Sequence, residues 1–104
     1  DMKIGVRSTP FEREYVLKGD FTFADENVFF NVYQSVKTQT EKHVVYNFEE
    51  CSFIDSAARG MLLVAFEEAV KRRRVQYIRF ASPQVREILH LAGVDRYFRF
   101  QNAK

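Results

Sequence analysis

The sequence lacks tryptophan, contains a single cysteine and carries a formal net charge of only +2 over 104 residues. One cysteine excludes an internal disulfide and fits a reducing cytoplasm. The small net charge gives no support to a nucleic-acid-binding protein. No apolar run approaches the length that spans a bilayer, and the amino terminus lacks the apolar segment of a signal peptide. We therefore expect a cytoplasmic protein that does not enter the membrane.

What the sequence does contain is typical of one small folded domain. Hydrophobic residues make up 46% and charged residues 29% of the chain, whose length suffices for one hydrophobic core. Eleven phenylalanines predict that bulky rings fill this core. We expect a single domain over residues 1–104, in which Met2 is the start methionine and Asp1 is a residue left by expression.

The hydrophobic pattern predicts strands that alternate with helices. The expected elements are strands over Lys3–Ser8 and Arg13–Leu17, a helix from Asp25 or Asn27 to about Thr38, a strand over Lys42–Phe48, a helix from the Asp55–Ser56 step to about Arg74, a strand over Val75–Ser82 and a helix from Pro83 to Gly93. The final VDRYFRF segment fits either a last strand or a docking tail. This order predicts an α/β fold, a mixed β-sheet of four to five strands with helices packed against it. The strand–helix–strand unit over residues 42–82 predicts a right-handed parallel crossover.

The Asp55–Ser56 step falls where a buried strand has ended and an apolar helix begins. Such turns often carry function in α/β proteins, because the N–H groups at the helix start face solvent. One interpretation is structural: a side-chain oxygen caps the helix, which is worth about 1 kcal/mol. The other is that Ser56 accepts a phosphate of roughly −1.5 to −2 charges, which the helix dipole favours and a docked acidic or apolar partner does not. The two interpretations are compatible.

Residues 44–66, VVYNFEECSFIDSAARGMLLVAF, resemble the core of STAS domains, the anti-sigma factor antagonist family. The resemblance continues through LKGDFTF at Leu17–Phe23, VQYIRFAS at Val75–Ser82 and ILHLAGVDRYFRF at Ile88–Phe100, and thus covers almost the whole chain. No single segment is specific, but their order and spacing together are. The resemblance implies a STAS-like mixed sheet.

The resemblance also implies partner switching. In such family members a kinase resembling histidine-kinase ATPase domains phosphorylates the serine of the Asp-Ser step, a PP2C-type phosphatase reverses this, and the unmodified form binds its partner. By position, the phosphoacceptor is Ser56. The residues that carry over as the partner-binding surface are Asp55, Ser56, Ala57, Arg59 and Met61. Family members often continue with a second hydroxyl residue and a glycine, whereas Ala-Ala-Arg follows here, which leaves Ser56 as the only acceptor of the motif.

The resemblance further implies a bacterial signalling protein that regulates transcription through protein partners, as a monomer or weak dimer without cofactor, metal, nucleic acid or membrane. A stand-alone regulator of biofilm formation is one such protein, although no residue identifies that pathway. The alternative is a constitutive STAS scaffold in a larger signalling or transport assembly, for which an exposed apolar patch around Met61 or the Tyr97–Phe98 end would argue. An enzyme is disfavoured, since no Gly-rich phosphate loop and no recognisable nucleophile–base pair are present.

The remaining polar residues favour structural roles. The run Lys71–Arg74 could bind phosphate, but basic residues in a last helical turn are expected from the helix dipole. His43 and His90 lie far apart with no third ligand, which argues against a metal site. Cys51 has no histidine placed to activate it, so we expect an unreactive thiol. The glutamates at positions 49–50 lack a paired role and are expected to be loop charges.

Overall fold

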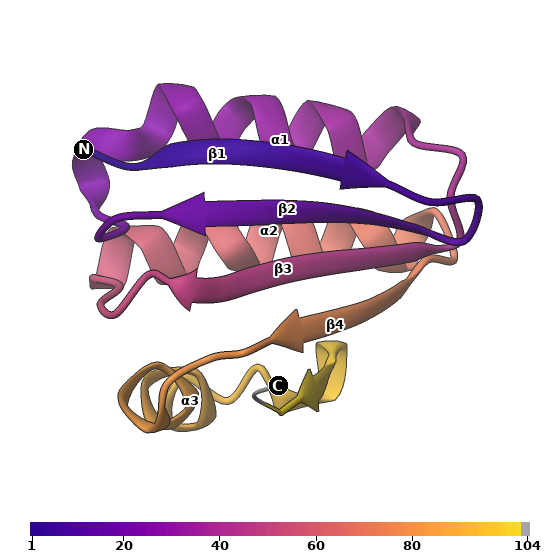
Figure 1. Ribbon diagram of the computed structural model, residues 1–104. Coiled ribbons are helices and arrows are strands. Elements are labelled where there is room, and N and C mark those ends of the chain that lie inside the picture. The colour runs from indigo at the N-terminus through magenta and orange to yellow at the C-terminus, as the bar shows by residue number, and fades with distance from the viewer. Residues whose placement is uncertain (103–104) are drawn as a thin grey trace.

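A computed structural model describes residues 1–102, in which five strands form one mixed sheet (Figure 1). The strands lie across the sheet in chain order; β1 and β2 are antiparallel and each later pair is parallel. The elements are β1 (Lys3–Ser8), β2 (Glu12–Lys18), the 3-10 turn η1 (Phe23–Asp25), α1 (Glu26–Thr38), β3 (His43–Glu50), α2 (Ser56–Lys71), β4 (Val75–Arg79), α3 (Pro83–Leu91), the 3-10 turn η2 (Asp95–Tyr97) and β5 (Arg99–Gln101). The predicted α/β fold is confirmed, with five strands, and the VDRYFRF segment contributes the last of them.

Helices α1 and α2 lie side by side against one face of the sheet (Figure 1). Alternate residues of β2 and β3 point into this layer, and their rings form the centre of the core. The Tyr15 hydroxyl donates to Ser35 of α1 at 2.8 Å, and the Tyr46 ring meets Phe66 of α2 edge-on at 5.3 Å. All three rings are fully buried, which stabilises the fold by about 1.5–3 kcal/mol for each such side chain. The predicted central strand is confirmed, because β3 is buried from Val44 to Phe48.

Helix α2 ends earlier than the sequence predicts. The pattern extends it to about Arg74, whereas the last helical residue is Lys71. The cause is Arg73, which adopts the left-handed conformation with φ of 59°. This turn lets the Arg74 N–H donate to the carbonyl of Ala69 at 2.9 Å, a bond that closes the helix end. An arginine at this position gives no local signal for a stop, because glycine is the usual residue there.

The end of β4 is corrected for the same reason, and the cap of α1 for a different one. Strand β4 ends at Arg79 rather than Ser82, because Phe80 has a φ of 61° and leaves the extended conformation. Asp25 holds the cap position of α1 as predicted, but its carboxylate accepts from the N–H groups of Thr22 and Met2, each at 2.9 Å, and does not cap that helix. Met2 is itself buried in the hydrophobic core and takes part in the fold.

The face of the sheet opposite α1 and α2 carries a network of ion pairs. The Arg79 guanidinium binds both oxygens of Glu12 at 3.0 Å, Glu14 at 3.1 Å and, through Nε, the Gln101 side chain at 2.6 Å. Arg79 therefore spans from β4 across β3 to β2 and also reaches β5. Glu14 is 5% exposed and receives further hydrogen bonds from Arg7 and Asn47 at 2.9 Å. Bidentate, largely desolvated contacts of this kind are stronger than exposed ion pairs.

No helix within residues 1–102 is both long enough and apolar enough to cross a membrane.

The ionisation of Glu14 predicts a dependence of stability on pH. Burial alone would raise the pKa of Glu14, but hydrogen bonds from Asn47 and Arg79 and the charges of Arg7 and Arg79 outweigh burial and lower the pKa. A lowered folded-state pKa stabilises the protein above the ordinary glutamate value of about 4.3, and this stabilisation is lost as the pH falls through the folded-state pKa.

We expect Glu14→Gln to be less stable than the wild type at pH 7, and the difference to shrink as the pH falls below about 4.3, because a protonated Glu14 resembles glutamine. Urea midpoints measured between pH 7 and pH 3 check this. Glu50→Gln, on an exposed residue at the end of β3, is the control and should change little at any pH. A difference for Glu14→Gln that stays constant down to pH 3 would contradict the assignment.

Candidate functional site

The loops that follow β2 and β3 are joined by backbone hydrogen bonds at the carboxyl ends of these parallel strands. The Gly19 N–H donates to Glu50 at 2.8 Å, the Phe21 N–H donates to Phe53 at 2.9 Å, and the Asp55 N–H donates to Phe21 at 3.1 Å. Gly19 has a φ of 105°, which favours glycine. The two loops therefore form one rim, and α1 and α2 both start from it.

Asp55 provides the side-chain contacts that hold this rim. Its Oδ1 accepts from the Ala58 N–H at 2.8 Å and so caps α2. Its Oδ2 accepts from the Phe23 N–H at 2.9 Å, in the loop that leads to α1. The capping interpretation of the Asp-Ser step is thus correct for Asp55, and the same carboxylate also links two loops. Charge-assisted bonds of this kind are about twice as strong as neutral ones.

Ser56 is the first residue of α2 and is exposed. Its hydroxyl makes no hydrogen bond to any residue in the part of the chain that the structure describes, because Asp55 already caps the helix. The positive end of the helix dipole lies at this position and favours an anion. The Ser56 hydroxyl is thus accessible, it has no structural role, and it lies in the field of the helix dipole, which favours a phosphate.

The other predicted site residues fall into two groups. Ala57 is exposed beside Ser56, and Arg59, half-buried, lies one turn further along α2 on the same side. Met61 is different: at five residues from Ser56 it lies well around the helix and lines a groove against α1 with Phe30. The structure therefore brings Asp55, Ser56 and Ala57 together and places Met61 apart from them.

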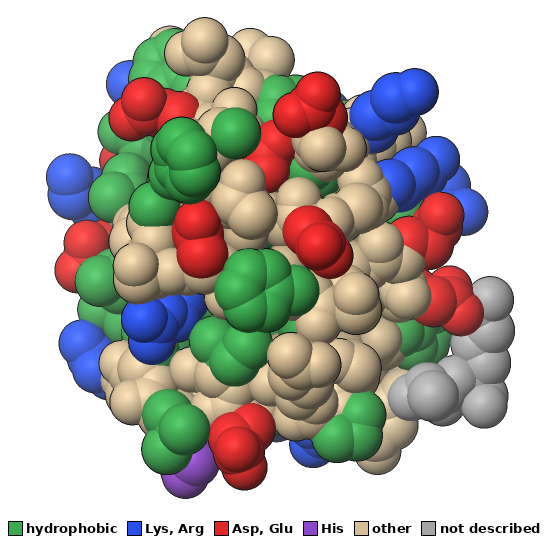
Figure 2. Space-filling view, turned by 90° about the vertical axis from the view of Figure 1, so that its left-hand side faces the viewer, with side chains coloured by type: hydrophobic (Ala, Val, Ile, Leu, Met, Phe, Trp, Pro, Cys, Tyr) green, Lys and Arg blue, Asp and Glu red, His purple; other side chains and the backbone are tan. Residues whose placement is uncertain are grey.

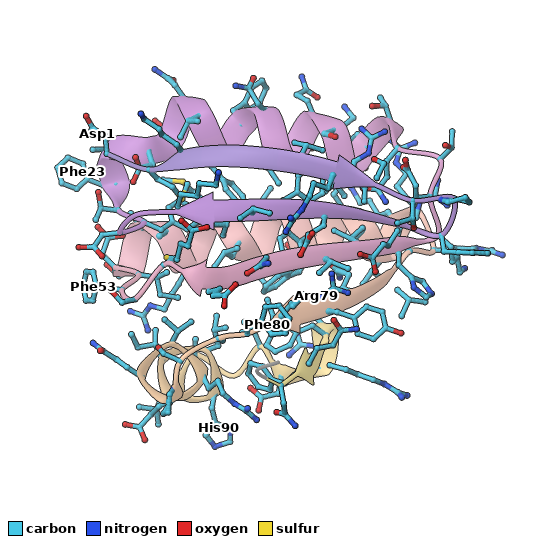
Figure 3. The ribbon with its side chains drawn as sticks, viewed as in Figure 1. Asp1, Phe23, Phe53, Arg79, Phe80 and His90 are labelled. Atoms are coloured by element: carbon cyan, nitrogen blue, oxygen red, sulfur yellow. The ribbon has the colours of Figure 1, made fainter. Side chains whose placement is uncertain are left out.

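Two exposed aromatic residues beside Ser56 were missed by the sequence reasoning. Phe23 in η1 is 74% exposed, and Phe53 in the loop before α2 is 40% exposed. Both project from the end of the molecule at which β2 and β3 end (Figure 3). Each is joined to the rim by its own backbone, since Phe23 donates to Asp55 and Phe53 accepts from Phe21. The sequence did offer a signal for them, because each of the two loops next to the predicted site contains a phenylalanine.

The surface around the rim is apolar and acidic. In the view onto this end, apolar and acidic side chains share the middle of the face, whereas Lys and Arg lie mainly toward its margins (Figure 2). The exposed acidic residues of the neighbouring segments are Asp20, Glu26, Glu49 and Glu50. A basic group with an apolar neighbour is the chemistry that complements such a surface.

The remaining candidate residues do not join the site. His90 is paired with Asp95 at 2.8 Å, which raises the pKa of this histidine, and His43 packs edge-on against Tyr77 at 5.3 Å. Cys51 is buried, and burial raises the pKa of its thiol, as expected for an unreactive cysteine. Residues 1–102 contain no group of three or more His, Cys, Asp and Glu side chains that could hold a metal ion.

Comparison with known proteins identifies the architecture. A family model for the STAS domain matches residues 12–104. A STAS-domain containing protein of Pseudomonas aeruginosa is 28% identical over 83 residues, which cover 80% of this chain and 81% of that protein. The Bacillus cell fate determinant SpoIIAA in its phosphorylated form superposes with a TM-score of 0.75 at 19% identity, over 98% of this chain and 92% of that one. The STAS domain of a SulP transporter from Vibrio cholerae has a TM-score of 0.69 at 22% identity, over 92% and 77% of the two chains.

The different duties of Asp55 and Ser56 predict different effects on stability. Asp55→Ala removes the acceptor of two backbone N–H groups and should lower the free energy of unfolding by about 1–3 kcal/mol. Ser56→Ala removes a hydroxyl without a partner and should change it by less than about 0.5 kcal/mol. Urea denaturation followed by circular dichroism compares the two. Equal losses for the two variants would show that Ser56 shares the capping role.

Proposed function

The chain belongs to the STAS domain family, and from that premise we propose that it is a phosphorylation-controlled protein-interaction module that works by partner switching, as anti-sigma factor antagonists do. Ser56 is the phosphoacceptor, and the unmodified form binds its partner. The observation that carries this proposal is the accessible Ser56 hydroxyl, which starts α2 without capping it. Phosphorylated SpoIIAA, which shares the fold, is consistent with it.

In the proposed cycle the domain is a substrate and a ligand, not a catalyst. A partner kinase resembling histidine-kinase ATPase domains transfers the γ-phosphoryl group of ATP to Ser56 Oγ, whose proton is released while ADP leaves. A PP2C-type phosphatase hydrolyses the ester, and inorganic phosphate returns to solvent. We place this cycle in the bacterial cytoplasm, where ATP is available and Cys51 stays reduced, with transcription or biofilm formation as its output.

The surroundings of Ser56 explain how a phosphate would release a partner. The fold tolerates the modification, because the dianion lies at the helix start and the Ser56 hydroxyl has no structural duty. A partner that covers Phe23 and Phe53 must also desolvate the side chain of residue 56 at the start of α2. A hydroxyl is desolvated at small cost, whereas a dianion beside the Asp55 carboxylate is not. Release thus follows from desolvation and from repulsion within the acidic rim.

The partner surface consists of the rim rather than of a pocket. Asp55, Ser56, Ala57 and Arg59 form its part on α2, and Phe23 and Phe53 provide exposed apolar area on either side of it. Aromatic residues at the centre of an interface often carry a large share of the binding energy.

A constitutive scaffold is the second candidate function. Phe30 and Val64, both more than half exposed, line one groove with Met61, which is the apolar patch that a scaffold requires. The likeness to a transporter STAS domain is consistent with this alternative. In a scaffold, the complex would form regardless of the state of Ser56.

Pull-downs from the native host's lysate separate the two functions. We expect the wild type and Ser56→Ala to recover the same partner in similar amounts. Ser56→Asp should recover at least tenfold less of it, because one carboxylate copies part of the charge of a phosphate. Ser52→Asp, which adds the same charge to an exposed residue of the same loop, is the matched control and should bind more strongly than Ser56→Asp. Equal recovery by all four proteins would support the scaffold.

The aromatic residues of the rim give an independent test. Phe23→Ser and Phe53→Ser should each weaken binding of the recovered partner at least tenfold, because exposed aromatic residues at an interface often carry much of the binding energy. Phe23→Ser should leave the unfolding midpoint nearly unchanged, since this ring is 74% exposed, whereas Phe53→Ser should lower it slightly, since Phe53 is 40% exposed. Titration calorimetry with the purified partner measures the binding. Phe11→Ser, on a 73% exposed ring between β1 and β2, is the control and should bind like the wild type. Full binding by both rim variants would place the partner elsewhere.

A further inference from the structure

The outer surface of the helical layer carries apolar residues that nothing in the described chain covers. Phe30 of α1 and Val64 of α2 are 54% and 51% exposed, and two adjoining hollows run along the seam between these helices. The first is lined by Glu26, Phe29, Phe30, Tyr33, Met61 and Val64. The second continues from Tyr33 and Val64 to Lys71. This surface meets the surroundings of the rim at Glu26 but extends away from Ser56 along the two helices.

Four residues of α1 form one line along this surface. Glu26, Phe30, Tyr33 and Lys37 follow one another at spacings of four, three and four residues, which places them on one side of a helix. The Phe30 and Tyr33 rings are in contact, with centroids 5.9 Å apart, and the Lys37 ammonium lies 5.8 Å from the centre of the Tyr33 ring. The line thus runs acid, aromatic, aromatic, base, from the first turn of α1 to its last.

This order is self-complementary. Its midpoint lies halfway between Phe30 and Tyr33 and also halfway between Glu26 and Lys37. We propose that a second copy of this chain covers the surface, related by a two-fold axis that makes the two α1 helices antiparallel. Glu26 then faces Lys37 of the second copy, and Phe30 faces its Tyr33. Each contact occurs twice, as a two-fold interface requires.

Charges and dipoles favour a second copy in this orientation. Antiparallel helices place the positive end of each α1 dipole beside the negative end of the other. The remaining acidic residues of the seam already have partners: Glu68 pairs with Arg72 at 2.8 Å, and Glu67 accepts from the Tyr97 hydroxyl at 3.4 Å. Glu26 and Lys37 form no ion pair with each other or with any other residue within residues 1–102, although the Lys37 charge also acts on Glu68, and the two-fold arrangement pairs them with each other.

The size of the surface sets the strength of the dimer. Helix α1 has 13 residues and is roughly 20 Å long, and two adjacent helices are roughly 20 Å wide. The contact then involves on the order of 400 Å² from each copy, below the size of standard stable interfaces. The structure accordingly points to a weak, reversible dimer that forms at high local concentration.

Sedimentation equilibrium over a wide range of protein concentrations tests the apolar part of the interface. We expect the wild type to change reversibly from monomer to dimer, and Phe30→Ser to raise the dissociation constant at least tenfold. Leu91→Ser, on a 75% exposed residue of α3, is the matched control and should dimerise like the wild type. A wild type that stays monomeric at every concentration overturns the proposal and leaves the seam to a different protein.

A charge exchange tests the orientation. Glu26→Lys and Lys37→Glu should each weaken the dimer, because each places like charges opposite one another. The double variant Glu26→Lys/Lys37→Glu should recover at least part of the lost affinity, since the pairs are restored with their signs exchanged. Circular dichroism at each temperature of measurement confirms that α1 remains folded. A double variant weaker than both single variants overturns the antiparallel arrangement. Ser56→Asp should dimerise like the wild type, because Ser56 does not line the seam, and this variant separates a failure of the dimer from a failure of the proposed switch.

Discussion

Asp55 accepts two backbone hydrogen bonds from different segments of the chain, one from the first turn of α2 and one from the loop before α1. Because both helices start from these segments, this carboxylate, together with the backbone hydrogen bonds between the loops, fixes how the two helix starts are placed relative to each other. It also saturates the cap position, which frees the neighbouring hydroxyl from any structural duty. Asp55 thus stabilises the rim, and Ser56 is left for the proposed switch; this division of roles depends on those two hydrogen bonds.

The two faces of the sheet are covered in different ways. On one face, α1 and α2 exclude water from the tyrosine-centred core, whereas the other face is covered by its own long side chains. Arg79 lies across β3 to reach Glu12 and Glu14, and Val45 and Asn47 of β3 are buried beneath this network. The cost of desolvating these charges is offset because each has several partners. The open face is therefore a polar surface whose charges pair with one another, whereas exposed apolar residues gather at the rim and along the helix seam and occur singly elsewhere, as at Phe11 and Leu91.

Most of the fold could be predicted from the sequence, because periodicity and turn residues are local signals. The apolar run of β3 and the Asp55–Ser56 step predicted a central strand and the start of a helix at the correct place. Local signals failed at Arg73 and Phe80, which adopt a left-handed backbone without being glycine, and so the ends of α2 and β4 were placed too late. They also failed for the Phe23–Asp55 hydrogen bond, whose partners are 32 residues apart and meet only after the loops pair. The exposure of Phe23 and Phe53 follows from the same pairing.

The unequal duties of Asp55 and Ser56 have a consequence for how the domain can evolve. An acceptor at position 55 stabilises the fold, so we expect lineages to keep one whatever the domain binds. Position 56 carries no such structural duty, so under the proposed switch its residue is retained only through the partner and the kinase that bind it. A descendant without the proposed kinase could then exchange the serine while it keeps the aspartate. Among related sequences, substitutions at position 55 would then reflect constraints of the fold, and substitutions at position 56 would reflect gain or loss of the proposed regulation.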